Sequence, residues 1–138
     1  MADKFVFVYV PVQTMLYPSA AYGVLKPVLN RNSLESELCD LNILLSKELT
    51  SDEFENLYNW SAFAKEDIDI KLKKKVVDIA DSKLYNFRGW LAFSVFSFYN
   101  ARIVNLLLNH IKDRQRDYKI LLGGNGCTAS LSEFDNKE

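Results

Sequence analysis

Apolar residues gather in four short runs along the chain, and longer segments with helical spacing separate these runs. The runs cover Lys4–Val10, Glu37–Ile43, Trp90–Phe98 and Tyr118–Leu122. Three of them are almost continuously apolar, which is typical of strands covered on both faces of a parallel sheet, whereas Glu37–Ile43 alternates only imperfectly. The pattern predicts four buried strands.

Two of the intervening segments begin with a recognisable helix cap. Ser19 can accept from the free amides of a first turn, which predicts a helix to about residue 30. Pro27 removes a backbone donor from that helix, so we expect a kink or an early end there. The sequence Thr50–Glu53 has capping-box spacing and predicts a helix through Trp60, with Tyr58 on its inner face.

Two further helices follow. Apolar residues recur at helical spacing over Asp67–Leu84, and the outward positions include Lys71, Lys73, Lys74 and Lys75. This lysine run would suit an anion or a partner domain, although a solvated helix face is the simpler interpretation. Asn100 is suited to cap a crossover helix between the third and fourth strands.

The order of these elements predicts an α/β fold. The four strands should be parallel because helical segments connect them, and right-handed crossovers would then place helices on both faces of the sheet. In a flavodoxin-like (Rossmann-like) sheet the first strand lies beside the third. The loops after Val10, Phe98 and Leu122 would then meet in one crevice at the carboxyl ends of the strands, where such sheets hold ligands.

Residues 1–138 are interpreted as a single domain with an enlarged helical connection at 44–84. Cys127–Phe134 looks like the start of another helix, but no fifth strand follows. The fourth strand, Lys119–Leu122, would therefore present a bare apolar edge, which natural domains avoid. We interpret the chain as the amino-terminal part of a longer protein, or as one whose partner supplies the edge. Self-association through this edge is a further expectation.

Composition narrows the classes of partner. The 138 residues are 49% hydrophobic and 25% charged with a net charge of −1, so no overall positive field favours nucleic acid or a membrane surface. No signal-peptide pattern and no apolar run of membrane-spanning length are present. The two cysteines, Cys39 and Cys127, form no metal-binding motif and suit a reducing cytoplasm.

Two features of the crevice suit ligand binding. The GGNG loop, Gly123–Gly126, lets a ligand approach the backbone and offers amides for a phosphate or amide group, although a tight turn into a helix explains it equally well. Ser94 would face the same cavity with its hydroxyl, or would be a small core residue bonded to its own backbone. The expected binding residues are Val12, Gln13, Thr14, Ser94, Phe96, Ser97, Tyr99, Gly123, Gly124, Asn125 and Gly126.

Three segments resemble the cobalamin (B12)-binding domain at the amino terminus of many radical S-adenosylmethionine (SAM) enzymes. They are KFVFVYVP at 4–11, WLAFSVFSFYNARIVNLL at 90–107 and KILLGGNG at 119–126. The resemblance implies a corrinoid held at the carboxyl ends of strands 1, 3 and 4, with Ser94 and Gly123–Gly124 around its dimethylbenzimidazole tail. It also implies a radical SAM domain in the same polypeptide, acting on a peptide or a small molecule. That domain would hold the [4Fe-4S] cluster and S-adenosylmethionine, because this chain has no CxxxCxxC motif.

The chain departs from related corrinoid proteins after its first strand. Corrinoid mutases carry an Asp-x-His-x-x-Gly motif whose histidine ligates cobalt, and the segment 12–17 has no histidine. The resemblance therefore implies a base-off corrinoid without a protein imidazole below the cobalt. The single histidine, His110, falls on the crossover helix, where an exposed helix residue is the simpler interpretation.

Other functions stay open. The same fold without a corrinoid would serve as a scaffold or a docking module, which the bulky Phe96, Phe98 and Tyr99 at the crevice would favour. The loop after the first strand offers neither the acidic pair of a receiver domain nor the phosphate loop of a flavodoxin. No GxSxG elbow or cysteine–histidine pair indicates a hydrolase. If the corrinoid binds, we expect Ser94→Leu or Gly124→Val to abolish binding without unfolding the chain.

Overall fold

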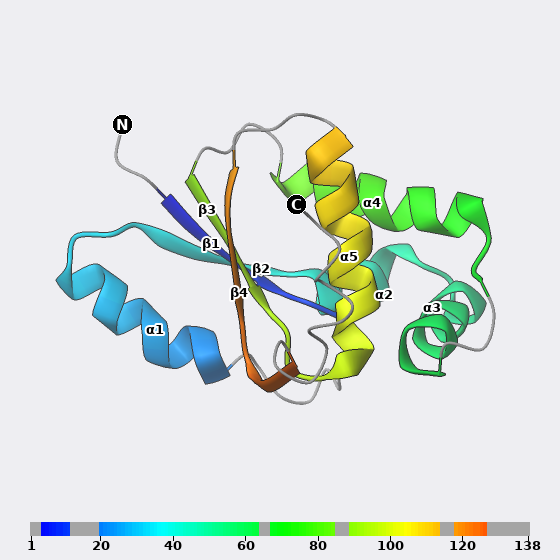
Figure 1. Ribbon diagram of the computed structural model, residues 1–138, viewed down its shortest axis with the longest axis horizontal. Helices are drawn as coiled ribbons and strands as arrows, with labels where there is room; N and C mark the ends of the chain where they lie inside the picture. The colour runs from blue at the N-terminus through cyan, green and yellow to red at the C-terminus, as the bar shows by residue number, and fades with distance from the viewer. Residues whose placement is uncertain (1–3, 12–19, 64–66, 85–88, 114–117, 127–138) are drawn as a thin grey trace.

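Four parallel strands form one sheet at the centre of the molecule (Figure 1). The computed structural model describes residues 4–11, 20–63, 67–84, 89–113 and 118–126. Its strands are β1 (Lys4–Tyr9), β2 (Ser36–Asp40), β3 (Gly89–Ser94) and β4 (Tyr118–Gly123), in the spatial order β2-β1-β3-β4. Each pairing is parallel, and β1 lies beside β3 as in a flavodoxin-like sheet. The predicted α/β fold class is confirmed.

The helices cover the two faces of the sheet unequally. Helix α1 (Ala20–Arg31) lies alone on one face in Figure 1, whereas α2 (Leu41–Glu48), α3 (Ser51–Phe63), α4 (Ile70–Leu84) and α5 (Phe98–Asp113) lie on the other. Helix α5 packs against α3 and α4, and α2 contacts α4 and β1. We call the two sides the α1 face and the α5 face.

The main hydrophobic core lies on the α5 face. Strand alternation directs Val6 and Val8 of β1, and Leu91 and Phe93 of β3, toward this side, and none of them is more than 2% exposed. Ile103 of α5 packs into the same cluster and is fully buried. Apolar burial, the dominant favourable term in folding, is therefore concentrated here.

The α1 face is covered loosely. No residue of α1 is buried, and Leu25 and Val28 are 41% and 48% exposed. The ring of Tyr22 lies 5.3 Å from that of Phe7, and its hydroxyl donates to the Ser36 carbonyl at 3.4 Å. These contacts attach α1 near β1 and β2 and leave the surface over β3 and β4 partly uncovered.

The second strand is shorter than predicted, and a helix replaces its end. β2 stops at Asp40, and Leu41–Ile43 begin α2. The Asp40 carboxylate accepts a hydrogen bond from the Ile43 amide at 3.0 Å, so it caps this helix. Leu41 and Leu45 then enter the core. The strand prediction was wrong because a short apolar run fits a strand or the inner face of a helix equally well.

Several local expectations are also wrong. β3 ends at Ser94 and α5 begins at Phe98, so the third strand is shorter than predicted and three residues connect it to the helix. Asn100, expected to be the cap, lies inside α5 and is fully buried. Helix α1 continues past Pro27 to Arg31, so of the two expected outcomes, a kink or an early end, the early end does not occur. Tyr58 of α3 is 41% exposed and does not face inward.

Candidate functional site

A cavity opens between α1 and the sheet. Its volume is about 330 Å³, within the range of small-molecule sites. It is lined by Phe5, Phe7, Ala21, Leu25, Val28, Leu29, Ala92, Phe93, Ser94, Leu121, Leu122, Gly123 and Gly124. We call it the α1 cavity. It reaches the carboxyl ends of β3 and β4, the edge at which parallel sheets bind ligands.

Three of the residues expected from the sequence line this cavity. Ser94 and Gly123 are register partners at the ends of β3 and β4, and Gly124 follows directly. Apart from Gly123 itself and its two chain neighbours, no heavy atom lies within 4 Å of the position that a Cβ on Gly123 would take. The structure therefore brings the serine and the glycine pair together, and Gly123 leaves open space beside them.

The other expected residues do not share this lining. Those described by the structure but absent from the cavity wall are Phe96, Ser97, Tyr99, Asn125 and Gly126. Phe96 is 66% exposed and points away from the packed interior. Val12, Gln13 and Thr14 lie outside the described residues.

The wall of the α1 cavity is almost entirely apolar. Phe5 and Phe7 contribute aromatic rings, Leu25 and Leu121 contribute aliphatic groups, and no lining residue is charged. Ser94 carries the one side-chain hydroxyl among the lining residues. Such a wall suits a flat or aliphatic group, with a single side-chain hydrogen bond to orient it.

Most of this wall was not among the binding residues expected from the sequence. Phe5, Phe7, Ala92 and Leu121 occupy alternate strand positions, which place them opposite the main core. An alternation of apolar and polar residues would have separated the two faces of each strand. The sequence shows no such alternation, because residues at the intervening positions are apolar as well. The loose packing of α1 distinguishes the two faces, and only the structure shows it.

Asn100 joins two loops at the carboxyl ends of β1 and β3. Its Oδ1 accepts from the amides of Phe96 and Ser97 at 3.1 and 3.0 Å, and its Nδ2 donates to the Pro11 carbonyl at 3.0 Å. The side chain is fully buried. One amide group thus satisfies backbone atoms from two distant parts of the chain and holds the two loops together, and Asn100 is the third residue of α5, not its N-cap residue.

Gly124 and Gly126 pack the loop after β4 against the loop after β3. A Cβ on Gly124 would lie 2.4 Å from the Val95 carbonyl oxygen, and one on Gly126 would lie 2.6 Å from the Ser97 amide nitrogen. The Gly126 amide donates to the Val95 carbonyl at 2.9 Å, so this donor is already used. Neighbouring backbone atoms therefore explain why both positions are glycine.

The valine side chain of Gly124→Val would clash with the Val95 carbonyl and disturb the packing of the two loops. The expectation that this substitution abolishes binding without unfolding the chain therefore does not follow.

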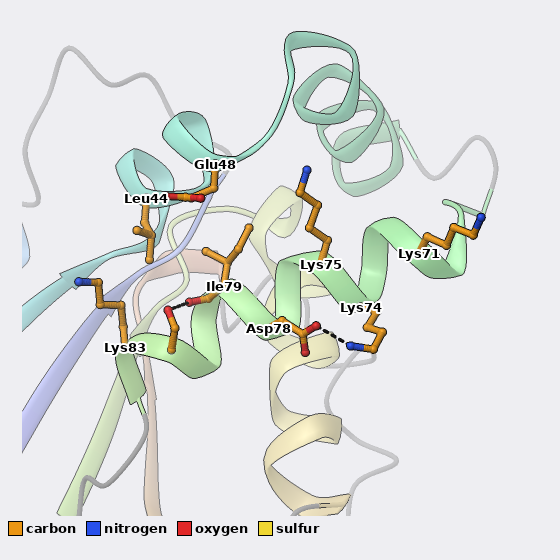
Figure 2. A pocket seen from close by; sticks show the side chains of 9 residues that line it. Leu44, Glu48, Lys71, Lys74, Lys75, Asp78, Ile79 and Lys83 are labelled. Carbon is orange, nitrogen blue, oxygen red and sulfur yellow. Dashed lines mark hydrogen bonds and ion pairs between the residues drawn. The ribbon is translucent and has the colours of Figure 1, made fainter.

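A second groove lies between α2 and α4, and lysines of α4 surround it (Figure 2). The Lys74 ammonium is 2.6 Å from the Asp78 carboxylate, and that of Lys75 is 2.8 Å from the Glu53 carboxylate. Carboxylates of the same chain already pair with these two lysines. This pairing favours the interpretation of the lysine run as a solvated helix face over a site for an anion or a partner domain.

The described residues contain no group of three or more His, Cys, Asp or Glu side chains able to hold a metal ion. His110 is not the exposed residue that we expected, since its side chain is 18% exposed and its Nε2 lies 3.5 Å from Asp81 Oδ1. It is absent from the lining of the α1 cavity. Burial raises the pKa of the Cys39 thiol to about 11, which keeps this thiol protonated and unreactive.

Comparison with known proteins assigns no family. No protein-family model, curated protein or solved structure matches the chain significantly. Within the described part of the chain, no helix combines the length and the apolar character needed to cross a bilayer. The geometry of the α1 cavity and the sequence motifs that reach it are therefore the features that bear on function.

Proposed function

We propose that this chain is a corrinoid-binding module in which the α1 cavity takes the tail of a base-off cobalamin. The observation that carries the proposal is the meeting of Ser94 and Gly123 at an apolar cavity beside the carboxyl ends of β3 and β4. The resemblance of segments 90–107 and 119–126 to cobalamin-binding domains supports it, because these segments supply that part of the wall.

The cavity residues fit the chemistry of such a tail. Benzimidazole is a flat and largely apolar ring system, and Phe5, Phe7 and Leu121 form a wall of matching character. Ser94 offers a hydroxyl to a polar atom of the tail, and Gly123 leaves its own side of the cavity open. Since α1 buries none of its residues, contact with a ligand would remove further apolar surface from water.

The work of this chain is to bind and orient the cofactor. Bound cobalamin would supply a cobalt centre for methyl transfer or a radical rearrangement. In this proposal a radical SAM domain of the same polypeptide holds the [4Fe-4S] cluster and S-adenosylmethionine and acts on a peptide or small-molecule substrate. In this proposal the protein works in the cytoplasm, whose reducing conditions keep the free thiol of Cys39 from being oxidised.

A titration with hydroxocobalamin tests the proposal. Binding should change the visible absorption spectrum of the cofactor. Gly123→Val places a branched side chain in the open space of the cavity, and it should weaken binding by at least about tenfold, as should Ser94→Leu. Gly23→Val is the matched control, because its Cβ also meets no atom within 4 Å but the residue does not line the cavity. Circular dichroism establishes that each variant is folded. Equal affinities in all variants would contradict the site.

A docking module without a corrinoid is the second candidate function. Exposed apolar side chains on both sides of the α1 cavity favour it, since Val28 of α1 is 48% exposed and Leu121 of β4 is 44% exposed. Apolar surface of this kind is typical of interaction sites when it is contiguous. A folded chain that leaves the hydroxocobalamin spectrum unchanged would support this second function over the first.

A further inference from the structure

We propose that β4 pairs with the β4 of a second copy of this chain, so that two sheets join into one. Among the described residues, β4 pairs with β3 alone and forms an edge of the sheet. The free side of an edge strand presents backbone donors and acceptors, which makes it a template for pairing with another strand. This inference does not depend on corrinoid binding.

The pairing with β3 determines which backbone groups face the free side. The Gly123 carbonyl accepts from the Val95 amide at 2.8 Å, so Gly123 directs its backbone groups toward β3. The amide and carbonyl of one strand residue point to the same side, and this side alternates along the strand. Ile120 and Leu122 therefore direct their amide and carbonyl groups toward the free edge, and Leu121 directs its amide and carbonyl toward β3.

The side chains along this edge are apolar on both faces of the sheet. Leu121 is 44% exposed and lies on the α1 face, where it lines the α1 cavity, and Ile120 is 36% exposed and points to the opposite face. Lys119 is the single charged residue of β4. Natural edge strands are usually protected by charges, prolines or bulges, and among the described residues of β4 Lys119 is the only such feature, so Ile120–Gly123 are left available for pairing.

One antiparallel register satisfies these features together. With Leu121 opposite Leu121 of the second copy, Ile120 lies opposite Leu122 and Lys119 lies opposite Gly123. Ile120 and Leu122 then exchange both backbone hydrogen bonds, because both direct these groups outward. Leu121 forms the non-hydrogen-bonded pair, in which side chains come closest, and no like charges face each other.

The symmetry of this register closes the assembly as a dimer. A two-fold axis passes between the paired Leu121 residues, so the interface uses the same strand on both copies and does not continue into a filament. The axis is perpendicular to the sheet, and both α1 faces therefore lie on the same side. Each copy adds its Leu121 beside the open edge of the other's α1 cavity, which extends that apolar wall.

Gel filtration with light scattering on the full 138-residue chain tests the dimer. We expect twice the monomer mass for the wild type and the monomer mass for Leu121→Lys, which brings two ammonium groups together at the axis. Leu25→Lys adds the same charge at another exposed residue of the cavity wall and should remain dimeric. A monomeric wild type would overturn the proposal, and any strand that pairs with β4 would then have to come from something other than a second copy of this chain.

Cysteine cross-linking tests the register. Leu121→Cys should form a disulfide with its own copy under mild oxidation, because Cα atoms of a non-hydrogen-bonded pair lie about 4.5 Å apart. Ile120→Cys is the control, since its two copies are diagonal neighbours about 7–8 Å apart, beyond the usual span of a disulfide. Peptide mass spectrometry locates the cross-link. A dimer whose Leu121→Cys variant fails to cross-link would overturn the register.

Discussion

At Gly124, a glycine is required by neighbouring backbone. Its φ of +105° is a conformation that L side chains rarely adopt, and the missing Cβ makes room for the Val95 carbonyl. One position earlier, Gly123 has no such neighbour. Two adjacent glycines therefore serve different purposes, since one lets two loops pack together and the other keeps the α1 cavity open.

Asn100→Ala should destabilise the protein strongly. The substitution removes the partners of the Phe96 and Ser97 amides and of the Pro11 carbonyl, and each buried group left unsatisfied costs about 1–3 kcal/mol. We expect the free energy of unfolding, measured by urea denaturation, to fall by about 3 kcal/mol. Asn109→Ala, at an exposed position of the same helix, should change it by less than about 0.5 kcal/mol. Equal losses would show that Asn100 does not hold the loops.

At the scale of elements, α3 begins where the capping-box sequence predicts. The Glu53 amide donates to Thr50 Oγ1 at 3.2 Å, and the Thr50 amide donates to Glu53 Oε2 at 2.8 Å. The same carboxylate accepts from Lys75 Nζ of α4 at 2.8 and 3.0 Å. The cap is a local signal within four residues, whereas the link between α3 and α4 exists only once the chain is folded.

Glu53→Gln should make stability respond differently to acid. Hydrogen bonds from Lys75, and then from the Thr50 amide, lower the pKa of Glu53 below its ordinary value of 4.5. Folding thus favours the charged form, so Glu53 stabilises the protein above pH 4.5, and this contribution is lost as the pH falls through the lowered pKa. Urea denaturation should show the variant to be less stable at neutral pH, with a difference that shrinks in acid.

The matched control for this pH dependence is Glu55→Gln. Glu55 is exposed on the same helix and has no ion pair among the described residues. Its substitution should leave the acid dependence of unfolding as in the wild type. If the difference between wild type and Glu53→Gln stayed constant into acid, the cap geometry and not the charge would be responsible.

At the scale of the whole molecule, α1 lies on one face of the sheet and α2 to α5 lie on the other (Figure 1), and these two layers differ in how firmly they are packed. Ile103 and Val104 of α5 are fully buried, whereas α1 has no buried residue. Little apolar surface becomes exposed to water when α1 separates from the sheet, so the free energy of opening this layer should be low. The candidate site lies under the less stable layer.

Hydrogen exchange followed by mass spectrometry should detect this asymmetry. We expect the amides of α1 to exchange at least about tenfold faster than those of α5, because local opening costs less where few apolar contacts are broken. A corrinoid in the α1 cavity should slow exchange in α1 and leave α5 unchanged. Comparable protection of the two helices in the free protein would contradict the loose packing of α1.

The errors of sequence interpretation fall where one local pattern fits two structures. Leu41–Ile43 suit a strand or a helix, and the Asp40 cap together with the core decides for the helix. Asn100 suits an N-cap, but its buried amide bonds a loop 89 positions earlier in the chain. Neither outcome can be inferred from neighbours within a few residues.

The sequence by itself determined the parallel α/β fold and the start of α3, because strand runs, helical spacing and caps are signals carried by adjacent residues. That β1 lies beside β3 followed from the flavodoxin-like pattern of the elements. Only the tertiary structure decided which face of the sheet is loosely covered, and that Ser94 and Gly123 share the α1 cavity with Phe7 and Leu25. The reason is physical: burial and cavity walls are produced by residues far apart in the chain, and no local pattern records which of them come together.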